Sequence, residues 1–99
     1  MTKNQESFVL DATKKTPSIK LDPATNVFEV EGRSLPENAI MFYSPVITWL
    51  RAYCENANPE TKLSFKIDYF NTPSAKPILD ILKVLDEIKD KGSKTHVTW

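Results

Sequence analysis

Hydrophobic and polar residues alternate along several short stretches of the chain, and this alternation predicts β-strands. Residues 18–22 and 27–31 alternate on either side of a short polar loop, which predicts an antiparallel hairpin. Residues 8–10 predict an edge strand or a packed arm, and residues 95–99 a final strand. The clearest strand covers residues 61–70, which place four large side chains on one face: Leu63, Phe65, Ile67 and Tyr69.

Two longer stretches carry apolar residues at helical spacing. The first opens with Ser34, Pro36 and Glu37, a helix-start signature with Ser34 as the cap. Pro45 falls inside its pattern and predicts a kink or two abutting helices. Its apolar positions are Ile40, Tyr43, Val46, Ile47, Leu50 and Cys54.

The second helical stretch begins at Pro73, the expected first helical position, and ends at Gly92. Its apolar stripe consists of Ile78, Ile81, Leu82, Leu85 and Ile88, widened by Leu79 and Val84. The opposite side carries mixed charges, which is typical of a solvated helix face.

The order of these elements predicts the fold class. A hairpin followed by strand–helix–strand units is expected to form an α/β (α+β) fold, a mixed sheet of four or five strands with two helices packed on one face. The 99 residues suit a single domain, with the polar residues 1–7 disordered.

Composition removes several classes of function. Thirteen basic and 13 acidic residues give no net charge, and no basic stripe predicts nucleic-acid binding. No apolar run approaches the roughly 20 residues that cross a membrane, and no secretion signal is visible. The lone Cys54 excludes an intramolecular disulfide and fits the reducing cytoplasm. One cysteine and one histidine do not build a zinc site, so we expect no metal or cofactor.

No catalytic motif is found either, so we expect a protein that is not an enzyme. Two glycines in the whole chain exclude a glycine-rich phosphate loop, and no nucleophile motif occurs. We interpret His96 as a packed or edge histidine and Cys54 as a small buried hydrophobe. Arg33 suits a surface ion pair better than a phosphate contact.

Thr72 is the most informative residue, because it stands where a strand turns directly into a helix. Helix starts carry unpaired N–H groups and favour negative charge, so a phosphate on Thr72 would be well placed. The alternative is that Thr72 only caps the helix by accepting the N–H of Ser74 or Ala75. The residues alone leave both interpretations open.

Several motifs together resemble the SiaC family of small bacterial regulatory phosphoproteins, whose fold is similar to the STAS domains of anti-sigma-factor antagonists. They are Glu31-Gly32-Arg33-Ser34-Leu35-Pro36-Glu37-Asn38, Phe42-Tyr43-Ser44-Pro45, Trp49-Leu50 with Tyr53, and Tyr69-Phe70-Asn71-Thr72-Pro73-Ser74-Ala75-Lys76. The resemblance covers residues 8–99. It implies that Thr72 is phosphorylated by a dedicated protein kinase, of the anti-sigma-kinase type, and dephosphorylated by a PP2C-type phosphatase.

The resemblance further implies that the unphosphorylated form binds and activates a diguanylate cyclase, and so controls cyclic-di-GMP signalling and biofilm formation. Asn71, Pro73, Ser74 and Lys76 are then the expected partner-binding residues around Thr72. An anti-sigma-factor antagonist of the general STAS type is the alternative, since fold and phosphorylation logic are shared. A small-molecule binder or enzyme is a third class and predicts a deep pocket with converging polar groups.

The chain departs from the family pattern in two places. Pro73 stands where relatives usually have serine, which removes an N–H beside the expected phosphate. Relatives also continue past Trp99 with an acidic, tyrosine-rich segment and a final helix, so we expect that C-terminal helix to be absent here. Its absence is expected to expose an edge or a face of the sheet.

Overall fold

The computed structural model describes residues 6–55 and 57–99, which form one sheet of strands and two helices. Residues 1–5 of the expected disordered segment lie outside the described residues. In chain order the elements are β1 (Phe8–Leu10), β2 (Ser18–Asp22), β3 (Val27–Ser34), α1 (Ala39–Cys54), β4 (Glu60–Phe70), α2 (Thr72–Asp90) and β5 (Lys94–Thr98).

The sheet is mixed, as the sequence predicts. Its strands lie in the order β1-β2-β3-β4-β5. β1 pairs antiparallel with β2, and β2 and β3 form the predicted antiparallel hairpin. β3, β4 and β5 run parallel to one another, because a helix connects each of these strands to the next.

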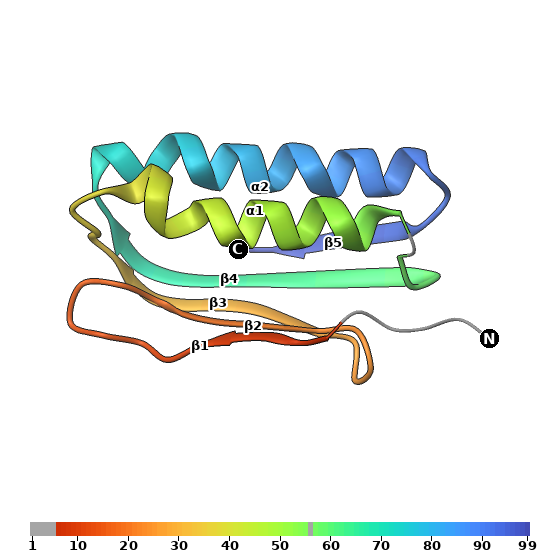
Figure 1. The fold of residues 1–99 in the computed structure, drawn as a ribbon, viewed down its shortest axis with the longest axis horizontal. Helices are drawn as coiled ribbons and strands as arrows, with labels where there is room; N and C mark the ends of the chain where they lie inside the picture. The colour runs from red at the N-terminus through yellow and green to blue at the C-terminus, as the bar shows by residue number, and fades with distance from the viewer. Residues whose placement is uncertain (1–5, 56) are drawn as a thin grey trace.

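Both helices lie side by side on the same face of the sheet (Figure 1). Each helix follows a parallel strand, so the turn from β3 into α1 and the turn from β4 into α2 meet at one end of the molecule. The predicted fold, a mixed sheet with two helices on one face, is confirmed. The start of α2, where Thr72 lies, is therefore a neighbour of the start of α1.

The core fills the space between the sheet and the helices. It is built from the helix-facing side chains of the central strands and the buried faces of both helices, including Ile19, Phe28, Val30, Tyr43, Val46, Leu50, Leu63, Phe65, Ile81, Val84 and Ile88. Two residues predicted for the helical stripes are corrected: Ile40 is 67% exposed and Leu79 is 51% exposed. Ala39 and Tyr43 begin the buried face of α1 instead, which turns Ile40 towards solvent.

The C-terminal end of β4 does not keep the simple alternation of buried and exposed residues that the sequence indicates. Gly32 pairs with Ile67, but the next residue, Arg33, pairs with Tyr69, so Asp68 is an extra residue in β4. Such a bulge reverses which side the following residues face, and Tyr69 is 60% exposed instead of joining the face of Leu63. Gly32 has φ +122°, a conformation that glycine adopts without the strain other residues meet.

The start of α1 is also different from the prediction. Ser34 does not cap it: β3 continues through Ser34, which is fully buried, and the cap is Asn38. The side chain of Asn38 accepts the N–H of Met41 at 3.1 Å. One helix runs through Pro45, so two abutting helices are not formed.

β5 forms an edge of the sheet and leaves apolar side chains in contact with solvent. Trp99 lies 5.1 Å from Phe65 and 6.2 Å from Phe70 between ring centroids, yet remains 60% exposed. Val97 is 44% exposed. Within the described ranges, neither helix is long and apolar enough to cross a membrane.

Candidate functional site

The candidate site is the first turn of α2, and its cap is Asn71. Asn71 has extended backbone angles, and its side-chain oxygen accepts the N–H of Ser74 at 3.2 Å. Thr72 is the first residue inside the helix and Pro73 the second. The interpretation of Thr72 as the cap is therefore wrong, and Pro73 lies one position later than predicted. Asparagine is at least as good a cap as threonine, so the helix starts one residue earlier than the sequence suggested.

Thr72 is exposed, and in the part of the chain that the structure covers no hydrogen bond to its hydroxyl is found. The hydroxyl of Thr72 therefore does not cap the helix. A group attached to it would lie in solvent at the positive end of a 19-residue helix.

Ser74 does not belong to the exposed surface, which corrects the expectation that it contacts a partner. Its exposure is 0%, and its hydroxyl lies 2.8 Å from the hydroxyl of Ser34. It also bonds the side-chain oxygen of Asn71 and the carbonyl of Ser34. The burial follows from helical spacing, because Ser74 lies on the same face as the buried Pro77 and Ile78.

An open hollow lies beside Thr72, between the starts of the two helices. Its volume is about 330 Å³, and it is lined by Glu37, Asn38, Ala39, Ile40, Thr72, Pro73 and Lys76. A second hollow of about 210 Å³ continues along the two helices towards Arg51 and shares Ile40 and Lys76 with the first. Together they form a shallow surface, which we call the interhelix groove. Neither hollow is the deep pocket expected of a small-molecule binder.

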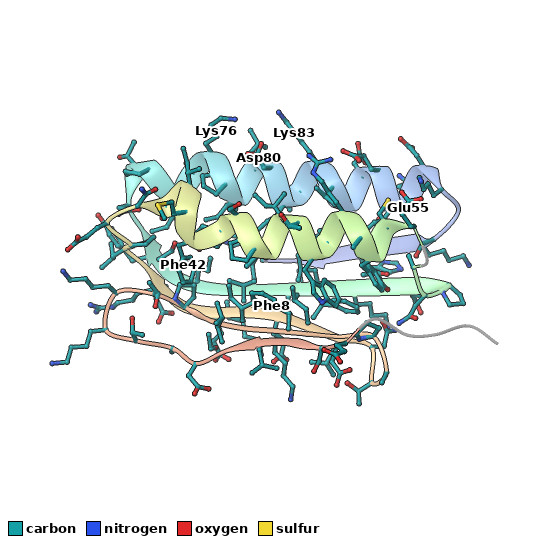
Figure 2. All side chains as sticks on the ribbon, in the orientation of Figure 1. Phe8, Phe42, Glu55, Lys76, Asp80 and Lys83 are labelled. Carbon is teal, nitrogen blue, oxygen red and sulfur yellow. The ribbon has the colours of Figure 1, made fainter. Side chains whose placement is uncertain are left out.

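The groove combines exposed apolar groups with charged side chains. Ile40 is 67% exposed and the adjacent Met41 71%. Lys76 and Asp80 project from the outer side of α2, away from the sheet (Figure 2), with Nζ and Oδ2 3.7 Å apart. At the other wall, Lys15 lies 3.8 Å from Glu37. These are exposed ion pairs of small energy, so a new charge at Thr72 would readily rearrange them.

The backbone offers little to an anion at this helix start. Pro73 has no N–H, and the N–H of Ser74 already bonds Asn71. A phosphate on Thr72 would therefore gain from the helix dipole and from Lys76, which lies one turn further on, more than from backbone donors.

The remaining candidate residues take no part in this site. His96 lies on β5 with Nε2 3.1 Å from Glu60, and Cys54 is buried at the far end of α1. Burial raises the pKa of the Cys54 thiol, which opposes reactivity. No group of three or more His, Cys, Asp and Glu side chains able to hold a metal is found among the described residues.

Sequence reasoning missed three residues near the site: Ser34, Tyr43 and Ile40. Helical periodicity placed Ile40 in the core, and Ser34 was interpreted as the cap of the first helix. Ser34 and Ser74 are 40 residues apart, and no local pattern links them. The signal that brings them together is topological, since Ser34 ends β3 and Ser74 follows the end of β4, the parallel strand next to it.

The fold and this site define a class of small mixed-sheet modules that present a hydroxyl at a helix start. The chain belongs to the SiaC family of regulatory phosphoproteins, whose family description matches residues 10–99. Apo-SiaC from Pseudomonas aeruginosa is structurally similar, with a TM-score of 0.86, 27% identity, and coverage of 94% of this chain and 77% of that one.

The chain is similar to two further proteins. The crystal structure of the diguanylate cyclase SiaD in complex with its activator SiaC, from the same species, matches with a TM-score of 0.85 and 28% identity over 93% of this chain and 75% of that one. An uncharacterized protein of Pseudomonas aeruginosa (strain UCBPP-PA14) is 29% identical over 90 residues, which are 91% of this chain and 71% of that protein.

Proposed function

We propose that this chain is a single-domain, non-enzymatic switch protein whose state is set by phosphorylation of Thr72. A protein kinase adds the phosphate and a PP2C-type phosphatase removes it. The unphosphorylated form binds and activates a diguanylate cyclase. The proposal places the protein in the cytoplasm, where the kinase and the cyclase find ATP and GTP.

The observation that carries this proposal is the exposed Thr72, which lines the interhelix groove and whose hydroxyl has no hydrogen-bond partner among residues 6–55 and 57–99. Family membership and the SiaD–SiaC complex support the choice of a cyclase as the partner. Of the four predicted contact residues we retain Asn71, Pro73 and Lys76 and leave out the buried Ser74. We further propose Ile40 and Glu37, because both line the same hollow as Thr72.

A phosphate on Thr72 would act on the partner more than on the fold. It brings a charge near −2 to a place where no internal contact has to break. A partner that covers the groove with apolar or acidic groups would meet an unfavourable, desolvated charge. We expect a loss of about 2–4 kcal/mol, which corresponds to tens- to hundreds-fold in affinity.

The test is to incubate the protein with its kinase and ATP and to locate the phosphate by mass spectrometry. Phosphate is expected on Thr72, and T72A is expected to block it while keeping cyclase activation. T98A changes another exposed threonine, on β5, and serves as the control. Phosphate on another residue with Thr72 unmodified would overturn the assignment.

A pull-down from cell extract tests the choice of partner. Recovery of a diguanylate cyclase supports the proposal. Recovery of an anti-sigma factor in its place would favour the alternative, an anti-sigma-factor antagonist.

A further inference from the structure

A line of buried hydroxyl groups connects both helices to the end of β3. The hydroxyl of Tyr43 on α1 lies 2.6 Å from that of Ser34, and the hydroxyl of Ser34 lies 2.8 Å from that of Ser74 on α2. All three residues are 0% exposed. The line ends on Asn71, the cap of α2, whose side-chain oxygen bonds both the hydroxyl and the N–H of Ser74.

The hydrogen atoms of these groups fix the direction of the line. Each hydroxyl has one proton, and that of Ser34 is donated to Ser74. Tyr43 must therefore donate to Ser34. The one proton of Ser74 has two acceptors, the side-chain oxygen of Asn71 at 2.5 Å and the carbonyl of Ser34 at 3.1 Å, and the shorter contact continues the line to Asn71. Burial raises the pKa of Tyr43, which keeps its proton in place as the first donor. Asn71 completes the line by donating its amide N–H to the carbonyl of Pro36 at 3.3 Å.

We propose that Tyr43, Ser34 and Ser74 are positioning residues that hold the Asn71 cap and thereby present Thr72 for modification. This inference rests on the proposed function for the modification itself, although the order of the first turn of α2 is testable alone. The reason lies in the geometry: Thr72 follows Asn71 directly, so its hydroxyl is placed by a cap that three elements hold.

A buried line of directed hydrogen bonds is cooperative, because each bond polarises the next. Removing the hydroxyl of Tyr43 leaves the Ser34 hydroxyl without its donor. The hydrogen bonds from Ser34 to Ser74 and from Ser74 to Asn71 are then weakened as well. The main-chain bond from Asn71 N–H to the carbonyl of Ser34, 2.9 Å long, remains and keeps the turn closed. We therefore expect a loosened first turn of α2 in an otherwise folded protein.

The chain offers a matched control near the other end of α1. Tyr53 is also buried, and its hydroxyl lies 2.8 Å from that of Thr61 and accepts the N–H of Asn58 at 3.0 Å. Y53F therefore removes one buried tyrosine hydroxyl far from Thr72. Urea denaturation first measures the free energy of unfolding of Y43F and Y53F. The effects of the two variants at the start of α2 are then compared after correction for that difference.

The first experiment measures amide hydrogen exchange of Ser74, Ala75 and Lys76 by NMR and needs no kinase. Y43F and S34A are expected to speed this exchange by about tenfold relative to Y53F, because local opening at the helix start becomes easier. Equal exchange in Y43F and Y53F, after correction for their global stability, would overturn the inference.

The second experiment measures phosphorylation of Thr72 by the kinase. Y43F and S34A are expected to lower kcat/KM by about tenfold, mainly through kcat, since a misplaced hydroxyl reacts slowly even when bound. Y53F should react like the unchanged protein. The double variant Y43F/S74A should be no slower than S74A alone, because both act through one line.

The two proposals fail in different ways. If the unchanged protein takes no phosphate on Thr72, the proposed function fails while hydrogen exchange still decides the positioning role. If it is phosphorylated and Y43F and Y53F react alike, the positioning role fails and the proposed function stands.

Discussion

The side-chain oxygen of Asn71 accepts two hydrogen bonds from Ser74, one from its backbone N–H and one from its hydroxyl. The same N–H also lies 3.0 Å from the backbone carbonyl of Asn71. A cap that holds a buried side chain as well as a backbone group joins the helix start to the core. The neighbouring Thr72 is thereby fixed in position while its own hydroxyl stays outside this arrangement. Because Asn71 caps the helix and Thr72 does not, the two residues are expected to contribute differently to stability.

N71A is expected to lower the free energy of unfolding by about 1–2 kcal/mol, because it removes the side-chain oxygen that accepts both the N–H and the hydroxyl of Ser74. T72A is expected to change it by less than about 0.5 kcal/mol, since the Thr72 hydroxyl makes no hydrogen bond within the described part of the chain. Urea denaturation followed by circular dichroism measures both. N71D keeps an acceptor at the cap and should retain most of the stability. A loss in T72A as large as in N71A would mean that Thr72 caps the helix after all.

The second prediction concerns the interhelix groove. I40D is expected to weaken binding to the diguanylate cyclase by at least about tenfold, because a charge replaces an apolar group within the proposed contact surface. Stability should hardly change, since Ile40 is largely exposed. Isothermal titration with the purified cyclase measures the affinity.

V9D provides the control for this experiment, because Val9 is 57% exposed on β1, away from the groove. It should bind the cyclase normally. If I40D bound as tightly as V9D, the groove would lie outside the interface.

The third prediction is a loss of stability at alkaline pH. Burial raises the pKa of Tyr43 in the folded protein, whereas in the unfolded chain it titrates at about 10. The folded state therefore holds the proton more tightly, so the stabilisation is complete below about pH 10 and falls as the pH rises towards the folded-state pKa. Urea denaturation between about pH 9 and 11 is expected to show a shallower decline in Y43F than in the unchanged protein.

Two other groups with a raised pKa are common to both proteins. Burial raises the pKa of Cys54, and the bond to Glu55 raises that of Lys91. The difference between Y43F and the unchanged protein therefore isolates Tyr43. Identical declines would show that the Tyr43 hydroxyl ionises as easily folded as unfolded.

The fourth prediction concerns the thiol of Cys54. It is 6% exposed and burial raises its pKa, so alkylation by iodoacetamide at neutral pH should be slow in the folded protein. In urea the reaction should speed up to that of a free thiol. Mass spectrometry follows the label, with C54A as the unlabelled control. Rapid labelling of the folded protein would indicate an opening at the end of α1.

The architecture was predictable because it follows from periodicity. Alternation in residues 18–22 and 27–31 found the hairpin, and the stripe around Ile81, Val84 and Ile88 found α2. Such patterns are set by burial on one face, and burial dominates the choice of element. The position of Thr72 at the start of a helix was predictable for the same reason.

The details of the site were not predictable, since they depend on contacts between distant segments. Ser34 looked like a helix cap, but pairing of β3 with β4 carries the strand through it and buries it. The bulge at Asp68 turns Tyr69 outwards, and no residue type in the sequence marks it. Adjacent Asn71 and Thr72 are both good caps, so only tertiary contacts decide between them.

Pro73 affects how long a phosphate on Thr72 would persist. Because this residue brings no N–H and its neighbour's N–H is already engaged, a dianion attached to Thr72 gains few fixed donors and stays hydrated. A phosphate that makes so few hydrogen bonds to its own protein is accessible to a phosphatase. Under the proposed function, the lifetime of the modified state is then governed by the opposing enzymes rather than by this chain.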